Sequence, residues 1–443
     1  MQPSPVLALP RRGLISVVTV WTAGNLANCS APPAQATRKI EREDGSEAVA
    51  YELPVDLRLL AVQGSFPSAW VSDFKKSQHK TARVHVTNRA QPLDVFEDIE
   101  TQVTGKAIKK RGGKSRKIDK HGYDLATLGD VWVGPAMARG LLSPIPGARD
   151  SDWWSSLPPK LQQTCTRNRQ GFPDANGEIC AVPYRWGCTM MAFRRDKLSQ
   201  RKIPWPVDWD DLWRPELAGR VAMIDAPREV IGAALKSQGL GYNPAHIDDV
   251  GALRNRLREL VKQVKFFSST QHLKALAAGE VWVIVGWSPE LISAAIKSTN
   301  IGLVVPSSGT SLWSDMWIVP ASRYSGKSPS PLLSQWLDFN LQERRLPKHR
   351  GLKGGVSPLH FPFDMDLAQG RDSGVRSSAR MDLQPRESVF FGSFNGNPQQ
   401  GTSTGILEGA MPSVEVMNHS EFILPLTHRA TSQCQLLLKD LRQ

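Results

Sequence analysis

The feature that most limits the fold of this chain is the alternation of short apolar runs with amphipathic stretches. Short apolar runs bounded by turn residues are typical of buried strands, and the stretches between them have helical periodicity. The predicted strands are Leu57–Val62, Ala82–Thr87, Tyr123–Leu128, Arg220–Ile224, Val264–Phe267, Val281–Val285 and Leu303–Pro306. The predicted helices are 67–76, 92–103, one containing Met137, 230–238, 247–263, 270–278 and 332–341. Strands that alternate with helices form βαβ units, so the sequence predicts an α/β fold with a mainly parallel sheet.

Polar residues follow several of the predicted strands. Ser65 comes after the first strand, Asp130 after the third, and Asp315 after the turn that ends Leu303–Pro306. Ligands of open α/β sheets bind outside the carboxyl ends of the strands. These three residues are therefore candidate ligand contacts.

The stretch LVVPSSGTSLWSDMWIVP, residues 303–320, holds the clearest candidate site. Two apolar runs flank a Ser/Gly turn that is followed by Trp313-Ser314-Asp315. An indole face attracts a cation by about 2 kcal/mol when water is excluded, and a nearby carboxylate neutralises the charge. The alternative is that Trp313 and Trp317 are core aromatics and that Asp315 caps the turn.

Charge and cysteine content exclude several classes of function. More than half of the net charge of +13 lies in KAIKKRGGKSRKIDK, residues 106–120. That segment has no aromatic residue for base stacking, which favours a solvated loop over a nucleic-acid surface. The five cysteines and nine histidines show no metal-ligand spacing, so we expect no metal and no cofactor. Cys165 and Cys180 could form a disulfide in an oxidising compartment.

The two ends of the chain differ in composition from its centre. Residues 1–38 lack acidic residues and carry Arg11-Arg12 before a short apolar core, as in a removable export segment. Asn28-Cys29 approaches a lipoprotein cleavage site, which makes Cys29 a candidate lipid anchor. We expect 39–56 to be a polar linker, 364–402 a disordered insertion, and 408–426 and 433–441 terminal helices.

Five ordered blocks resemble extracellular solute-binding proteins, specifically the spermidine/putrescine-binding subunit of ABC importers and its cyanobacterial and plant plastid homologues. The blocks are YDLATLGDVWV, VPYRWGCTMMAF, WDDLWRPELAGRVAMIDAPREVIGAAL, LAAGEVWVIVGWSPE and SGTSLWSDMWIVPA. The resemblance implies a type II periplasmic-binding fold, in which two lobes enclose a cleft. Its implied boundaries are 57–183 plus 306–349 for lobe I and 184–305 plus 350–443 for lobe II.

Carried over residue by residue, the resemblance places the family's aromatic and acidic ligand contacts on Trp287, Trp313, Asp315 and Glu229. Asp130 occupies a lobe I contact position, and Asp225 lies next to a further acidic position that is Ala226 in this chain. Asp225 and Glu229 also open a predicted helix, where acids favour the dipole without binding anything. Converging carboxylates repel one another, and a di-cation relieves that repulsion.

The resemblance therefore implies a monomeric, non-catalytic protein that captures a polyamine-like cation for an ABC permease. It implies export to a bacterial periplasm or to a plastid, in the thylakoid lumen or the stroma. The alternatives are a binder of another small solute on the same fold and a plastid-retained protein with a structural or interaction role. An enzyme using Cys188 is disfavoured, because its neighbours WGCTMM supply no base.

Overall fold

The structure is a computed structural model that describes residues 37–41, 47–51, 54–78, 80–106, 121–321, 330–342, 355–361 and 412–441. It divides into two units, Met1–Leu53 and Pro54–Gln443. In the first unit, strands β1 (Thr37–Glu41) and β2 (Glu47–Tyr51) pair as an antiparallel hairpin. The prediction of a linker over 39–56 is therefore wrong for these strands. The uncharged run Ala48–Tyr51, which includes the strand formers Val49 and Tyr51, suits a strand that the linker interpretation overlooked.

The second unit begins with a parallel group of strands. Strand β3 pairs in parallel with β4 and with β5, and β5 pairs antiparallel with β14. The elements of this part are β3 (Val55–Val62), α1 (Ala69–Ser77), β4 (Ala82–Arg89), α2 (Pro92–Thr104), β5 (Leu125–Gly129), α3 (Asp130–Ala138) and β6 (Leu142–Ser143). A connecting region follows, with α4 (Asp152–Ser156), α5 (Pro159–Cys165), β7 (Thr166–Arg167) and β8 (Glu178–Ile179).

A second parallel group is built from later parts of the chain. Strand β10 lies between β11 and β12 and is parallel to both, whereas β12 pairs antiparallel with β9. Its elements are α6 (Arg195–Gln200), β10 (Val221–Met223), α7 (Pro227–Lys236), α8 (Val250–Gln263), β11 (Val264–Phe267), α9 (His272–Ala278), β12 (Val283–Trp287), α10 (Ser288–Lys297) and β13 (Ile301–Val304). Alternate residues of β10 and β12 enter two separate apolar cores on opposite faces of the sheet. Burial on both faces explains why these strands are continuously apolar.

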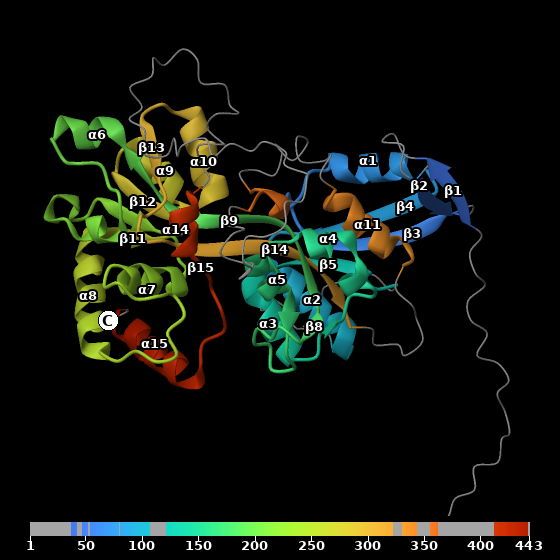
Figure 1. Cartoon of the computed structure of the whole chain (residues 1–443). Coiled ribbons are helices and arrows are strands. Elements are labelled where there is room, and N and C mark those ends of the chain that lie inside the picture. The colour runs from blue at the N-terminus through green and yellow to red at the C-terminus, as the bar shows by residue number, and fades with distance from the viewer. Residues whose placement is uncertain are drawn as a thin grey trace, which may run out of the picture. The chain divides into compact units, whose positions relative to one another are not determined.

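Two long strands join the groups into one eleven-stranded sheet. In β9 (Ala181–Arg194), the first half pairs with β14 (Ser311–Pro320) and the second half pairs with β12 and β13. Figure 1 shows β9 and β14 side by side between the two groups. The predicted lobe boundaries at 183/184 and 305/306 fall within β9 and between β13 and β14.

Most predicted strands and helices of the second unit are confirmed, with two corrections. Trp313-Ser314-Asp315 lies inside β14 rather than in the turn before it, because Gly309 and its neighbours complete the turn earlier. The predicted helix 408–426 is wrong: α14 spans only Val414–Asn418, and β15 (Glu421–Phe422) pairs in parallel with β14. The chain then forms α15 (His428–Leu441). Most of loop 106–120 and all of 364–402 lie outside the described residues.

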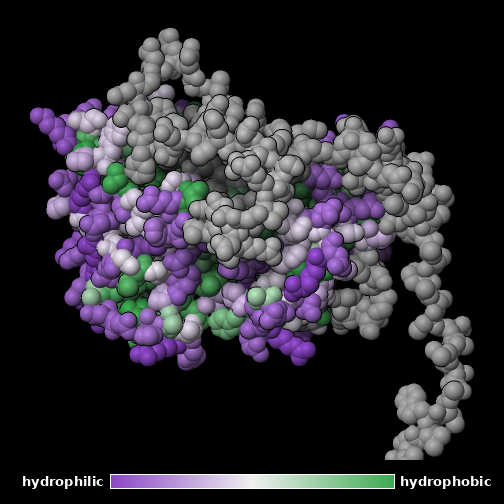
Figure 2. Space-filling model, in the orientation of Figure 1, coloured by the Kyte–Doolittle hydropathy of each residue, from purple (hydrophilic) through white to green (hydrophobic). Residues whose placement is uncertain are grey.

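The first group has an aromatic core. Trp317 lies at ring distances of 5.3 Å from Phe66, 5.1 Å from Tyr184 and 5.7 Å from Trp336, which belongs to α11 (Leu332–Asn340). Trp317 is fully buried, as the core alternative for this residue predicted. The described surface in Figure 2 is mostly hydrophilic, with small separate hydrophobic areas. None of the described helices is long and apolar enough to cross a membrane.

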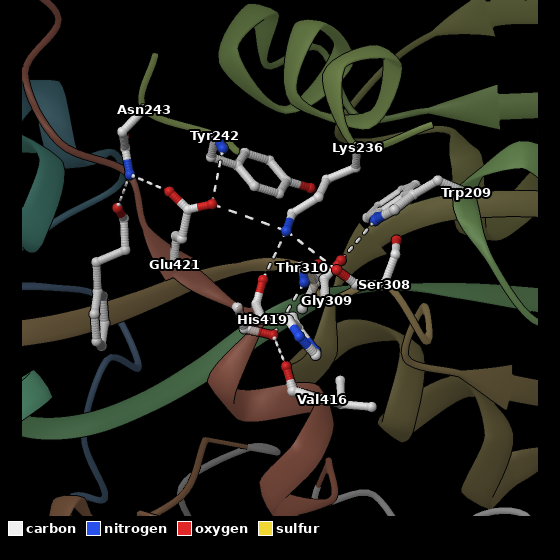
Figure 3. Close-up of polar contacts among 12 residues, drawn as sticks. Trp209, Lys236, Tyr242, Asn243, Ser308, Gly309, Thr310, Val416, His419 and Glu421 are labelled. Atoms are coloured by element: carbon white, nitrogen blue, oxygen red, sulfur yellow. Dashed lines mark hydrogen bonds and ion pairs between the residues drawn. The ribbon is translucent and has the colours of Figure 1, made fainter. Parts of the chain in front are cut away.

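Two lysines hold the segment Val414–Phe422, which we name the C-terminal clasp. Lys160 of α5 donates to the carbonyls of Met417 and Ser420, both at 2.7 Å. Lys236 of α7 donates to the carbonyls of His419 at 2.7 Å and Ser308 at 3.1 Å. Figure 3 shows the Lys236 amine between these oxygens and the Glu421 carboxylate, which lies 3.8 Å away. The clasp is therefore attached to both parts of the second unit.

Candidate functional site

Strand β14 carries a row of polar and aromatic side chains on one face. Ser311, Trp313 and Asp315 are two residues apart, and alternate residues of a strand share a face. At about 3.3 Å per residue, the row is about 13 Å long. It therefore matches the length of a small extended solute.

Asp315 is paired with an arginine of the neighbouring strand. The register of β14 and β9 places Arg185 directly opposite Asp315, next to an irregularity that skips Tyr184. The Arg185 Nε and Nη2 atoms lie 2.6 and 2.5 Å from Asp315 Oδ2. The guanidinium also lies 5.8 Å from the centre of the Trp313 ring, within cation–π range. The guanidinium of Arg185 thus makes the contacts with Asp315 and Trp313 that the sequence analysis assigned to a cationic ligand.

Trp313 lies over a glycine. Gly187 is directly opposite it, and a Cβ at Gly187 would come within 2.3 Å of Trp313 Cζ2 and 2.5 Å of Ser288 Oγ. Ser288 follows Trp287 at the end of β12 and accepts a hydrogen bond from the Cys188 amide at 3.3 Å. The absence of a side chain at Gly187 therefore lets the indole approach the residues that follow β12.

Glu229 is buried at the start of α7. Ser311 Oγ donates to Glu229 Oε2 at 2.6 Å, which links this helix to β14. Burial raises the pKa of Glu229, and the Ser311 hydrogen bond, the nearby polar groups of Thr189 and Trp287, and the Arg228 charge offset part of that rise. Trp287 thus lies close to Glu229, and the role of both residues as ligand contacts stays a prediction.

Asp130 is the first residue of α3, directly after β5. The Ser314 amide donates to Asp130 Oδ1 at 3.2 Å, and Asp130 is 4% exposed. Burial raises its pKa to about 7; the Asp315 charge adds to the rise, whereas the Arg167 charge and backbone hydrogen bonds oppose it. A buried carboxyl that titrates near neutral pH has no adequate counter-cation of its own.

The two other predicted residues, Ser65 and Asp225, differ in burial and in their neighbours. Ser65 is buried and lies near the hydroxyl of Tyr184, the residue before Arg185. Asp225 is exposed, and its backbone amide donates to Ser269 Oγ at 3.1 Å. Six of the seven predicted residues therefore fall in two sets along β14, and Asp225 stands apart. Glu229 and Trp287 lie near Ser311, whereas Trp313, Asp315, Asp130 and Ser65 are linked through Arg185, Ser314 and Tyr184. We name five of them the Trp–carboxylate cluster: Trp287, Trp313, Asp315, Glu229 and Asp130.

Two basic residues at the cluster were missed by sequence reasoning. Arg185 is the one charged residue inside the apolar run AVPYRWGCTMMAF, which is the signal that could have revealed it. Arg167 is 3% exposed and donates to the carbonyls of Gln163 and Thr166. No local pattern marks Arg167, since its approach to Asp130 depends on tertiary packing.

The cysteines of the described residues are free thiols. Burial and the Glu229 charge raise the pKa of Cys188 to about 12, so this thiol stays protonated and is a poor nucleophile. The Cys180 amide donates to the Cys165 carbonyl at 3.0 Å, which places the two residues opposite each other without a bond between their sulfurs. Within the described ranges, no group of three or more potential ligands could hold a metal ion.

The fold is that of periplasmic binding proteins. The chain is similar to the solved spermidine/putrescine ABC transporter substrate-binding protein of Streptococcus pneumoniae, with a TM-score of 0.62 and 18% identity, over 88% of this chain and 98% of that one. It is also similar to a spermidine/putrescine ABC transporter protein of Listeria monocytogenes, with a TM-score of 0.57 and 17% identity, over 88% and 99% of the two chains.

Residues 122–351 match the model for bacterial extracellular solute-binding proteins, and the chain belongs to that family. It is 26% identical over 200 residues to the spermidine/putrescine-binding periplasmic protein of Escherichia coli, covering 45% of this chain and 54% of that one. It is 26% identical over 243 residues to a putrescine/agmatine-binding protein of Pseudomonas aeruginosa, covering 51% and 61%. The chain thus aligns with little more than half the length of these relatives. The family consists of binding proteins rather than enzymes, in agreement with the expectation of a non-catalytic protein.

Proposed function

We propose that this protein binds a small organic cation of the amine class at the Trp–carboxylate cluster. The observation that carries the proposal is the buried Glu229, which accepts a hydrogen bond from Ser311 of β14, two residues before Trp313, and lies close to Trp287. Its raised pKa reflects a carboxylate that lacks a sufficient counter-charge, and an ammonium group supplies one. The printed names of the relatives, which include spermidine, putrescine and agmatine, support the same class of ligand.

The role of the bound solute follows from the family. We propose that the two parts of the second unit are lobes that close on the solute, and that a monomer delivers it to an ABC permease outside the cytoplasm. The relatives named above are bacterial and are described as periplasmic or as parts of ABC transporters, which supports this location. Affinity to cyanobacterial and plastid homologues, a plastid location and an anchor at Cys29 rest on sequence motifs alone.

Calorimetric titration of the full chain with spermidine and putrescine tests the ligand class. We expect saturable heat with at least one amine, and a loss of roughly tenfold or more in affinity in Glu229→Gln, because the neutral amide cannot pair with an ammonium. Glu216→Gln is the matched control, since Glu216 is an exposed carboxylate in the short helix Pro215–Leu217 and is not part of the cluster. The absence of heat with spermidine, putrescine and the mono-cation N-acetylputrescine, from micromolar to millimolar concentration, would remove the proposal and leave the fold unchanged.

A further inference from the structure

We propose that Arg185 is a built-in cation that occupies the Asp315–Trp313 end of the site, so that the solute carries one cationic group rather than two. The inference rests on the proposed function, because it assumes that the Trp–carboxylate cluster binds an amine. It narrows the ligand from polyamines in general to solutes with one ammonium end and one uncharged end.

The first step is the fixed position of Arg185. The strand register sets Arg185 and Asp315 directly opposite each other, and such pairs are the closest side-chain neighbours in a sheet. Both nitrogen contacts are charge-assisted and short, at 2.6 and 2.5 Å. The Arg185 side chain is 14% exposed and that of Asp315 is 24% exposed, so water competes only weakly for the pair.

The second step is that Arg185 makes the two contacts that a ligand ammonium would make here. It neutralises the carboxylate of Asp315, and its guanidinium lies 5.8 Å from the Trp313 ring centre. An incoming ammonium would have to displace this guanidinium or lie next to it. Displacement would break the charge-assisted hydrogen bonds between Arg185 and Asp315. An ammonium next to the guanidinium would place two positive charges together.

The third step is the charge that remains. With the charge of Asp315 neutralised by Arg185, the remaining charge lies near Ser311, at the other end of the row on β14, where Glu229 of α7 accepts the Ser311 hydroxyl and lies close to Trp287. The adjacent Arg228 donates to the carbonyls of Leu424 and Tyr242 at 3.1 and 3.0 Å, so its guanidinium is directed to backbone oxygens. Glu229 is therefore the end that favours an ammonium. At the Arg185 end, Asp130 is buried, accepts the Ser314 amide and has a pKa raised by burial to about 7, so beside the fixed guanidinium this end favours a group without positive charge.

The test compares two solutes with the same carbon chain. Putrescine has two ammonium groups, and N-acetylputrescine has one ammonium and one neutral amide. We expect the full-length protein to bind N-acetylputrescine roughly tenfold more tightly than putrescine in calorimetric titrations. Arg185→Met should shift the ratio of the two affinities toward putrescine by roughly tenfold or more, while Arg185→Lys, which keeps the charge, should retain the original preference.

Arg194→Met is the matched control. Arg194 lies in the same strand and also pairs with a carboxylate, that of Asp196 at 2.7 Å, with side-chain exposures of 14% and 27%. We expect the Arg194→Met variant to prefer N-acetylputrescine over putrescine by the same ratio as the unmodified protein. A full-length protein that prefers putrescine, or an unchanged ratio in Arg185→Met, overturns the inference alone. If neither solute binds to any of these proteins at millimolar concentration, the proposed function fails and the inference falls with it.

Discussion

The chemistry of the candidate site is decided by four ionisable side chains. Asp315 has a full partner in Arg185, whereas Asp130 and Glu229 are buried with incomplete compensation. Buried carboxyls without a counter-cation hold their protons to higher pH. The site of the free protein therefore contains acids that are ready to ionise when a cation arrives.

Asp130 gives a prediction for the pH dependence of stability. Its pKa is about 7 when folded and near 3.8 in the usual environment, so between these values the folded state binds more protons than the unfolded state. The contribution of Asp130 to the unfolding free energy therefore falls as the pH rises through this window. From about pH 5.5 to about pH 7.5, the unmodified protein should lose on the order of 1–2 kcal/mol more than Asp130→Asn in urea unfolding.

The control is Asp196→Asn. Arg194 holds the pKa of Asp196 below its usual value, so its titration lies below this pH window. We expect this variant to show the same pH dependence as the unmodified protein. Identical slopes for Asp130→Asn and the unmodified protein would show that Asp130 is ionised throughout this window.

At the scale of elements, the pairing of β9 with β14 assembles the site. Gly187 and Arg185 on one strand face Trp313 and Asp315 on the other. The cluster thus depends on strand register, because a shift of one residue would turn these side chains to the opposite face.

Gly187→Ala tests this packing. A Cβ at this position would lie 2.3 Å from the Trp313 ring, so the indole must move. We expect a shift in tryptophan fluorescence and at least a tenfold loss of amine affinity, with destabilisation of about 1–3 kcal/mol. Gly129→Ala is the control, since the added methyl would meet its nearest neighbours at 3.8 and 3.9 Å. Equal effects of the two substitutions would contradict the proposed contact.

The sequence predicted the α/β class and most strands of the second unit because those strands are continuously apolar and end at turn residues. The spacing of Trp313 and Asp315 is a local signal, whereas Trp287 and Glu229 were named from the resemblance to solute-binding proteins. The role of all four residues as ligand contacts stays a prediction. The sequence placed Asp315 at a turn because Ser307–Gly309 is a strong turn signal, and the extension of β14 through Trp313 depends on pairing with β9 and β5. The partners Arg185 and Arg167 were missed because pairing across distant segments leaves no local pattern.

The C-terminal clasp gives a second prediction at this scale. Lys236→Met removes the donor to the Ser308 and His419 carbonyls and leaves them without this partner. We expect a loss of about 1–3 kcal/mol in unfolding free energy and faster hydrogen exchange over 414–422. Lys274→Met, an exposed lysine of α9, should have an effect within about 0.5 kcal/mol of zero. Unchanged exchange over the clasp in Lys236→Met would contradict the importance of this amine.

At the scale of the whole molecule, every residue of the Trp–carboxylate cluster lies in the unit Pro54–Gln443. The hairpin β1–β2 belongs to the other unit, in which its two strands pair with each other. Removal of residues 1–53 should therefore leave amine affinity within about twofold and the unfolding midpoint nearly unchanged. Calorimetric titration and thermal unfolding of both forms check this, and a loss of binding in the shorter form would show that the first unit contributes to the site.

The clasp has a consequence for tolerance to substitution. Lys160 and Lys236 donate to backbone carbonyl oxygens, which every amino acid has. These hydrogen bonds therefore do not depend on the side chains of Met417 and His419. A library randomised at residue 419 should therefore yield many folded clones. In a library randomised at 160 or 236, most clones should unfold at a lower temperature than the unmodified protein, because a side chain without a long cationic end leaves two carbonyls without their donor.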